Sequence, residues 1–278
     1  MCVLTDRYVQ ESQINTLEKA IEEGEVELPL VIVNDPVESE IDPGLAASAT
    51  NERFGLDTVR LFVDALKYEG AWALVYAEKK IAELLGERAA SSSRIPVEEV
   101  PCLSDSEIHY TTPIVDGAWS ELPQDAVKLT RENCDVAIRF GFGLLRGDIL
   151  EAPEFGVLSF HLADIRQYRG LGVQQAWLDD RERMGVTLQR INEEIDGGEI
   201  VAYDETDVSD CATLWEVYDV LHELQAELLV EGLDNLRNRP TEITPPDSLG
   251  PYYSLNSRRG ITFAGRTLLK NVSGRIRR

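Results

Sequence analysis

Short apolar runs alternate with longer amphipathic stretches along this chain, and this alternation limits the folds that it can adopt. Met1–Leu4 and Leu28–Val33 have the composition of buried strands, and Glu11–Glu23 between them has apolar residues at helical spacing. Strands separated by helices are typical of a parallel sheet with helices packed against it. The sequence therefore predicts an α/β fold with a mostly parallel sheet and helices on both faces.

The same pattern continues to residue 238 and gives one continuous series of elements. A chain of 278 residues is long enough for one large α/β domain. We expect this domain to span residues 1–240, followed by a C-terminal extension over residues 241–278. The further predicted strands are Asp135–Phe140, Gly156–His161, Val186–Ile191 and Glu199–Tyr203, and the further predicted helices are Asp57–Lys67, Ala71–Leu85 and Thr213–Asn238.

The charge balance excludes a broad basic face. Asp and Glu number 50 against 27 Lys and Arg, which gives a net charge of −23 at pH 7. Binding nucleic acid through its phosphates requires clustered basic residues, so nucleic acid is an unlikely partner for the body of the chain. We interpret the acidic excess as adaptation to a salty cytoplasm, as in a halophile.

The end of the chain differs from the rest in its charge. From Ser248 to Arg278 the sequence has seven basic residues and no acidic residue. One interpretation is a tail held against the acidic body by ion pairs. The alternative is a flexible arm that binds RNA or another anionic partner.

The four cysteines lack the spacing of a metal site or of a dense disulfide framework. Cys2, Cys102, Cys134 and Cys211 include no C-x-x-C pair, so we expect free thiols in a reducing cytosol and no metal. The N-terminus turns polar too early for a signal peptide, and no apolar run approaches the ~20 residues of a membrane span. These features predict a cytoplasmic protein with no membrane partner.

Only one of the three histidines has the context of a functional residue. His109 has no carboxylate or cysteine at the spacing of a metal site, and His222 lies within the long predicted helix, so we interpret His109 as non-functional and His222 as a surface or interhelical packing residue. His161 ends an apolar strand, and a loop rich in Asp, Arg and Gly follows it. In open α/β sheets the crevice outside such strand ends is where ligands bind.

Four segments around His161 carry a resemblance to a known family. In order, they are Gly156–His161, Tyr168-Arg169-Gly170, Gly185-Val186-Thr187 and Asp196-Gly197-Gly198. Over about residues 135–205 the chain resembles the formyltransferases, which include glycinamide ribonucleotide, methionyl-tRNA and sugar-amine N-formyltransferases. The resemblance implies a Rossmann-like fold and a folate-dependent N-formyltransferase, which transfers a one-carbon formyl group from 10-formyltetrahydrofolate to an amine.

The same resemblance assigns roles to three residues. Amine attack on a formyl carbon creates an oxyanion, which is stabilised by hydrogen-bond donors already in place. A protonated His161 would be one donor, and Asp196 would keep it charged, hold a water and help to remove the amine proton. The alternative for Asp196 is a turn-stabilising residue before two glycines.

Ser159 stands where the family has an asparagine and would be the second donor. Its shorter hydroxyl leaves three interpretations open: a slower enzyme, an altered acceptor or a non-catalytic relative that binds folate or another metabolite. A second departure is Asp164 and Arg166, which follow His161 where the family usually has a proline. Their position predicts an unusual acceptor.

The turn Gly141–Gly147 matches the segment that lines the folate pocket in the family. By that resemblance Leu144, Leu145 and Arg146 would contact the pterin on one side, and Ile191 and Glu194 would lie on the other. One alternative is a tight turn with packing leucines. Another is a dinucleotide fingerprint, which would make the chain a nucleotide-dependent oxidoreductase.

The acceptor is predicted by elimination. The loop Thr5–Gln10 has no glycine, so a phosphate-cradling loop like that of the glycinamide ribonucleotide enzymes is not supported. The residues after Pro240 are too few for the tRNA-binding domain of methionyl-tRNA enzymes. A small-molecule amine is left, either an amino sugar or an amino acid derivative, and the oligomeric state stays open.

Overall fold

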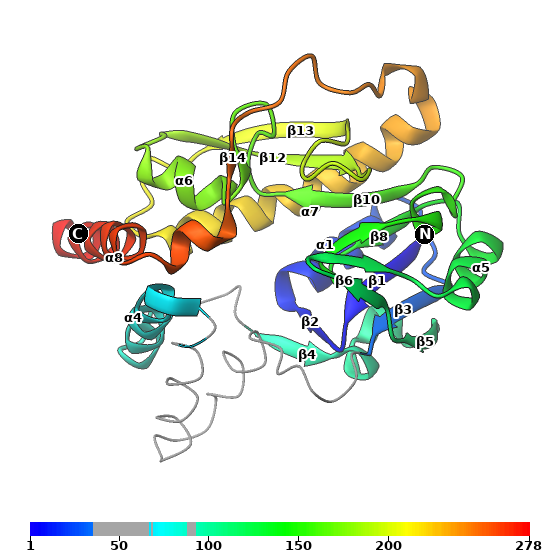
Figure 1. Cartoon of the computed structure of the whole chain (residues 1–278), viewed down its shortest axis with the longest axis horizontal. Helices are drawn as coiled ribbons and strands as arrows, with labels where there is room; N and C mark the ends of the chain where they lie inside the picture. The colour runs from blue at the N-terminus through cyan, green and yellow to red at the C-terminus, as the bar shows by residue number, and fades with distance from the viewer. Residues whose placement is uncertain (36–66, 68, 88–92) are drawn as a thin grey trace.

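The computed structural model describes residues 1–35, 67, 69–87 and 93–278. Its central feature is a seven-stranded sheet with the order β13-β12-β10-β8-β1-β3-β5. Strands β10, β8, β1, β3 and β5 run parallel, and β12 and β13 continue the sheet antiparallel (Figure 1). The strands are β1 (Cys2–Asp6), β3 (Leu30–Asn34), β5 (Glu107–Thr111), β8 (Ala137–Arg139), β10 (Val157–His161), β12 (Arg183–Arg190) and β13 (Glu199–Asp207).

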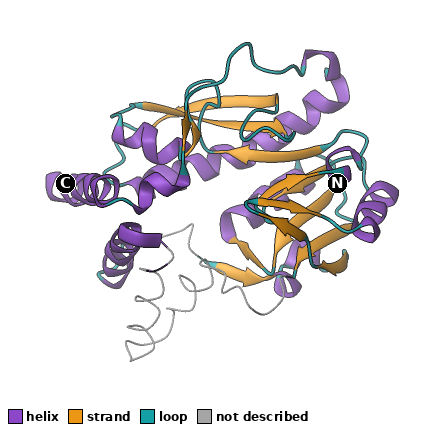
Figure 2. Ribbon diagram, viewed as in Figure 1, coloured by secondary structure: helices purple, strands orange, loops and turns teal. Residues whose placement is uncertain are grey.

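Helices cover both faces of this sheet, as predicted (Figure 2). Alternate residues of a strand point to opposite faces, so Val3 packs with helices α1 and α7 while Leu4 packs with α5. Both faces are therefore buried, which explains why the central strands are apolar without interruption. The helices are α1 (Glu11–Glu22), α4 (Ala73–Leu84), α5 (Gln124–Asn133), α6 (Gly172–Leu178), α7 (Leu214–Asn238) and α8 (Ile261–Arg277).

Short strands make three smaller ribbons beside the main sheet. Strand β2 (Tyr8–Gln10) pairs with β4 (Arg94–Pro96), and β7 (Trp119–Glu121) pairs with β6 (Ile114–Asp116) and β9 (Leu144–Arg146). The third ribbon joins β11 (Arg169–Gly170) to β14 (Tyr252–Tyr253).

Helix α7 shows how local sequence sets an element's limits. The Thr213 hydroxyl accepts a hydrogen bond from the amide of Glu216 and so caps the first turn. The helix ends at Asn238, two residues before Pro240, as the sequence predicts. The strand predicted over Asp135–Phe140 is shorter in the structure, where β8 spans only Ala137–Arg139. The predicted helix Asp57–Lys67 falls almost entirely outside the described residues.

The basic C-terminal segment is held against the acidic body, which confirms the first of its two interpretations. Residues 261–277 form α8, a helix that the sequence analysis did not predict. Basic residues of this C-terminal segment, in α8 and on either side of it, form ion pairs with acidic residues elsewhere in the chain. The pairs are Arg258 with Glu69, Lys270 with Asp180, Arg275 with Glu78 and Glu87, and Arg278 with Glu216.

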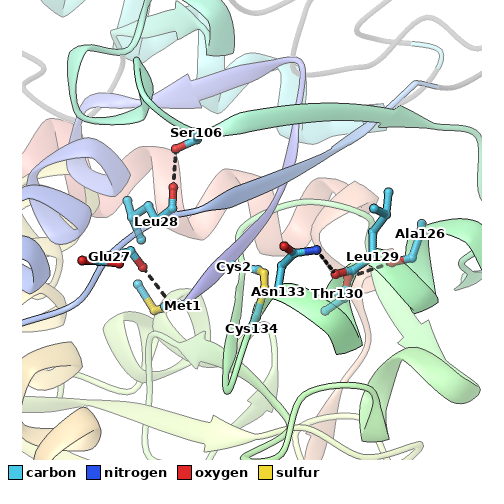
Figure 3. The surroundings of a disulfide bond; sticks show 10 residues. All are labelled: Met1, Cys2, Glu27, Leu28, Ser106, Ala126, Leu129, Thr130, Asn133 and Cys134. Carbon is cyan, nitrogen blue, oxygen red and sulfur yellow. Dashed lines mark hydrogen bonds between the residues drawn. A yellow bond between two sulfur atoms is a disulfide. The ribbon is translucent and has the colours of Figure 1, made fainter.

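Two cysteines are paired, contrary to the prediction of four free thiols. Cys2 lies on β1 and Cys134 follows α5, with 5.6 Å between their Cα atoms, and they form a disulfide (Figure 3). The chain passes Cys134 on its way into β8, the neighbour of β1, so two distant thiols come within bonding reach. Cys102 and Cys211 are free. Free thiols, which are typical of a reducing cytosol, are therefore limited to these two residues, and the cytoplasmic location stays a prediction.

Within the described ranges, no helix has both the length and the apolar character that crossing a bilayer requires.

Candidate active site

His161 and Asp196 lie against each other, as the resemblance to the formyltransferases implies. His161 is the last residue of β10, and Asp196 lies in the loop between β12 and β13. The distance from His161 Nδ1 to Asp196 Oδ1 is 3.4 Å, and both side chains are largely buried. The topology thus brings together an imidazole and a carboxylate that are far apart in sequence.

The other ring nitrogen of His161 is also engaged. Nε2 lies 2.8 Å from the main-chain oxygen of Tyr168. A carbonyl oxygen can only accept a hydrogen bond, so Nε2 carries the proton. The contact of Nδ1 with Asp196 is longer than an ordinary hydrogen bond. Nδ1 is therefore the ring nitrogen that a reacting group can approach, whereas Nε2 is committed to the backbone.

The imidazole of His161 packs directly against Gly172, which has no side chain to fill that space. A Cβ atom at this position would lie 2.5 Å from His161 Nε2 and 2.6 Å from the Cβ of Ala163. Any side chain here would displace the ring, so the first residue of α6 has to be glycine. Sequence reasoning missed this residue, although it stands two positions after the Arg169-Gly170 pair.

The loop that carries Asp196 is held by the Arg169-Gly170 motif. Asp196 Oδ2 accepts a hydrogen bond of 2.7 Å from the Gly170 amide. Arg169 Nη1 donates to Glu194 Oε1 at 3.0 Å and to the Ile195 carbonyl at 3.2 Å. Asp196 has a positive φ of 48°, an uncommon conformation for a residue other than glycine. One carboxylate oxygen thus anchors the turn, and the other faces His161.

The segment after residue 240 contributes to this arrangement. Strand β14 pairs with β11, and Arg169 Nε donates to the Gly250 carbonyl at 2.9 Å. A Cβ atom on Gly170 would lie 2.1 Å from the Tyr253 carbonyl oxygen, so the close approach of the two strands requires glycine. The C-terminal segment therefore supports the loop that positions Asp196. The division of the chain at residue 240 stays a prediction.

Ser159 lies two residues before His161 on β10 and is bound by an arginine. The Arg139 side chain donates from Nε at 3.2 Å and from Nη2 at 2.7 Å to Ser159 Oγ. Burial lowers the pKa of the Arg139 guanidinium, and the carboxylates of Asp196 and Asp6 act in the opposite direction. Sequence reasoning missed Arg139, whose signal was the one charged residue inside the apolar run Val136–Phe140.

The turn Gly141–Gly147, predicted to line the folate pocket, contains both buried and partly exposed side chains. Leu145 is 1% exposed and packs in the core beside α5, which agrees with the interpretation as a packing leucine. Leu144 is partly exposed, and Arg146 contacts Asp116 at 3.1 Å. The Gly147 amide donates to Glu193 Oε1 at 3.2 Å, so the turn and the loop after β12 lie next to each other.

On the other side of the predicted folate pocket, Ile191 and Glu194 have different contacts. Ile191 packs against the same core cluster as Leu145. Glu194 is paired with Arg169 and helps to hold the Asp196 loop. Contact of either residue with folate stays a prediction.

The dinucleotide interpretation of the turn lacks its structural context. A dinucleotide fingerprint joins a strand to the N-terminus of a helix. Here the turn after β8 leads into strand β9 and then into a short 3-10 helix, Asp148–Glu151. The turn therefore does not have the geometry that binds a pyrophosphate.

A cavity of about 600 Å³ is lined in part by Tyr168, Gln167 and Tyr203. Asp164 lines it, and this carboxylate accepts hydrogen bonds from Arg166 Nε at 2.7 Å and from Gln167 Nε2 at 2.9 Å. Burial raises the pKa of Asp164, but these hydrogen bonds outweigh it, and the net shift is downward. Arg166 lies over the ring of Tyr203.

The other histidines lie in packing positions. His222 stacks on Tyr218 within α7, and burial lowers its pKa to about 4. His109 Nε2 lies 3.7 Å from Asp125. Among the residues that the structure describes, no group of three His, Cys, Asp or Glu side chains could hold a metal ion.

The sequence profile of the family "Formyl transferase" matches residues 58–233. The methionyl-tRNA formyltransferase of Pseudoalteromonas translucida is 27% identical over 62% of this chain and 54% of the relative. That of Fusobacterium nucleatum is 21% identical over 51% of this chain and 44% of the relative. The chain thus spans about half the length of these relatives.

Solved structures share the fold at low sequence identity. A sugar N-formyltransferase from a Shewanella species gives a TM-score of 0.52 at 13% identity and covers 98% of this chain and 87% of its own. The N-formyltransferase of Helicobacter canadensis, in complex with folinic acid and dTDP-3-aminofucose, gives 0.50 at 11% identity over 97% and 79% of the two chains. The profile covers more than half of the sequence, and the predicted resemblance is confirmed: this chain belongs to the formyl transferase family.

Proposed function

We propose that this chain transfers a formyl group from 10-formyltetrahydrofolate to the amine of a small-molecule acceptor. The observation that carries the proposal is the pair formed by His161, the last residue of β10, and Asp196 in the loop between β12 and β13, with 3.4 Å between Nδ1 and Oδ1. Membership of the formyl transferase family supplies the reaction class.

The reaction needs two things that this pair can supply. The acceptor nitrogen attacks the formyl carbon, and the resulting oxyanion requires a donor, which is the Nδ1 proton of His161. The carboxylate of Asp196 keeps that proton on the ring by its negative charge. As the intermediate collapses, the bond from the carbon to N10 of the folate breaks, and the proton lost by the amine ends on N10. Asp196, directly or through a water, is the group placed to relay it.

For the formyl donor, we propose a site between the turn Gly141–Gly147 and the loop after β12. The hydrogen bond from Gly147 to Glu193 supports this placement because it joins the two sides. Leu145 would act through its backbone, since its side chain is in the core. Leu144 and Arg146 on one side, and Ile191 and Glu194 on the other, complete the proposed contacts.

For the acceptor, an amino sugar or amino acid derivative is favoured over tRNA. The relatives include methionyl-tRNA formyltransferases by sequence and sugar N-formyltransferases by fold. The net charge of −23 repels a polyanion. Four basic residues of the C-terminal segment, Arg258, Lys270, Arg275 and Arg278, are paired with carboxylates of the body, which leaves them less able to bind phosphates.

The test combines binding with turnover. Tetrahydrofolate and NADH are titrated separately against tryptophan fluorescence, and formyl transfer is then measured with amino sugars, sugar nucleotides carrying an amine, amino acids and methionyl-tRNA. The proposal expects saturable folate binding and turnover with a small amine. Folate binding without turnover on any acceptor would favour the non-catalytic relative, and NADH binding without a folate response would overturn the proposal.

A further inference from the structure

Arg139 and Ser159 form a hydrogen-bonded pair on neighbouring strands of the sheet. They lie opposite each other in the register of β8 and β10. Nε and Nη2 of Arg139 both point at Ser159 Oγ, at 3.2 and 2.7 Å. The Ser159 side chain is buried and that of Arg139 is partly buried. The arginine therefore determines how the serine hydroxyl is oriented.

The chemistry of the two groups fixes the direction of the hydroxyl proton. A guanidinium has five N–H donors and no acceptor. Ser159 Oγ therefore accepts both hydrogen bonds, which occupy its two lone pairs. Among the described residues, these are the only side-chain hydrogen bonds that Ser159 makes. Its single proton is left for an acceptor other than Arg139.

His161 follows two positions later on the same strand, so its side chain projects from the same face of β10 as that of Ser159. We propose that Arg139 is a positioning residue of the transfer site, whose guanidinium fixes the Ser159 hydroxyl as a hydrogen-bond donor to the formyl oxygen. The inference rests on the proposed function and identifies how a serine serves as its second donor.

Two further contacts of Arg139 suit this role. Its Nη1 donates to the carbonyl of Gly143, which belongs to the turn proposed to line the folate site. One guanidinium thus connects that turn to the strand that carries Ser159 and His161. Burial lowers the pKa of the Arg139 guanidinium, and the carboxylates of Asp196 and Asp6 act in the opposite direction and partly offset it. A positive charge held beside Ser159 would also stabilise a developing oxyanion.

A double-mutant cycle tests the inference. Formyl transfer is measured for the parent, Arg139→Ala, Ser159→Ala and the double variant, with the acceptor that the amine panel identifies. We expect each single change to lower kcat by about 10²-fold, the usual cost of one oxyanion donor. The double variant should lose little more than Ser159→Ala, because the two residues act as one unit.

Chemical rescue separates positioning from a merely structural role. Added guanidinium chloride, at a concentration that leaves all variants folded, should raise the kcat of Arg139→Ala at least tenfold. It should leave the double variant unchanged, because that variant has no hydroxyl to orient. Arg183→Ala is the control for ionic effects, since Arg183 is exposed and pairs with Glu205.

Arg139→Lys covers the case in which the alanine variant does not fold. Lysine keeps the charge but lacks the paired donors, so kcat should fall about tenfold while the Kd for tetrahydrofolate stays at the parental value. Additive losses in the cycle, no rescue by guanidinium, or parental kcat in Arg139→Lys would overturn the inference. A parent that transfers formyl groups to no acceptor would instead contradict the proposed function itself.

Discussion

The imidazole of His161 faces two hydrogen-bond acceptors at once. Asp196 Oδ1 lies 3.4 Å from Nδ1, and the Tyr168 carbonyl lies 2.8 Å from Nε2. Only the doubly protonated ring offers a proton to both. This geometry makes the charge of Asp196 central to the proposed chemistry.

Replacing Asp196 by asparagine tests that dependence. The amide keeps the size of the side chain, and its oxygen can still accept the hydrogen bond from Gly170. Without the negative charge, kcat should fall by about 10²–10⁴-fold, the usual contribution of acid–base catalysis. Thermal unfolding should change little. Parental kcat in Asp196→Asn would show that the carboxylate only stabilises its turn.

Gly172→Ala should damage the site through packing. The new methyl group would lie 2.5 Å from His161 Nε2, so the ring must move away from the Tyr168 carbonyl. We expect kcat to fall at least tenfold, and the free energy of unfolding to fall by about 1–3 kcal/mol from overpacking. Steady-state kinetics and urea unfolding measure the two effects.

Gly265→Ala is the matched control for that change. Gly265 lies on α8, and a Cβ atom there would meet nothing within 4 Å. Alanine in a helix is favoured over glycine by roughly 0.5–1 kcal/mol, so this variant should be more stable and fully active. Equal loss of activity in both variants would contradict the specific role of the space beside His161.

His222 should contribute to acid sensitivity. Burial lowers its pKa from 6.5 to about 4, so the unfolded chain takes up the proton first as the pH falls. Its contribution to stability is complete above pH 6.5 and is lost towards pH 4, at a cost of roughly 3 kcal/mol. His222→Phe removes this loss and keeps the stacking on Tyr218. Urea unfolding at pH 7 and at pH 4 measures the difference, and an unchanged pH dependence would refute the buried neutral histidine.

The pairing of Cys2 with Cys134 predicts the number of reactive thiols. In denaturant without reductant, a thiol reagent should detect only Cys102 and Cys211, and reduction should expose all four cysteines. The Cys2→Ser variant provides the control, because it should release the thiol of Cys134. Four thiols before reduction would show that the two cysteines are not bonded.

The central strands and the proximity of His161 and Asp196 were predicted from the sequence. Strands buried on both faces, such as β1 and β3, are continuous apolar runs and need no tertiary information. His161 ends such a strand, and Asp196 precedes two glycines, so both carry local signals. Edge strand β5, Glu107–Thr111, was missed because its residues are mostly only partly buried or exposed and show no apolar run.

Helix α8 and the role of Arg139 could not be predicted because both depend on contacts with distant parts of the chain. The buried face of α8 contains Thr267 and Asn271, while Ile261 and Leu269 are exposed, so the apolar pattern does not mark the packed side. Arg139 gains its meaning from Ser159, which lies on the neighbouring strand. Contacts between segments distant in sequence, including that of Cys2 with Cys134, depend on the completed sheet.

The most direct test of this account is the rate of formyl transfer from 10-formyltetrahydrofolate by His161→Ala, with the parent and His109→Ala measured beside it. We predict that His161→Ala loses about 10²–10⁴-fold in kcat, binds tetrahydrofolate with the parental Kd and unfolds as the parent does. His109→Ala should keep its activity. Near-parental turnover by a folded His161→Ala protein would contradict the role of the imidazole and with it the proposed site.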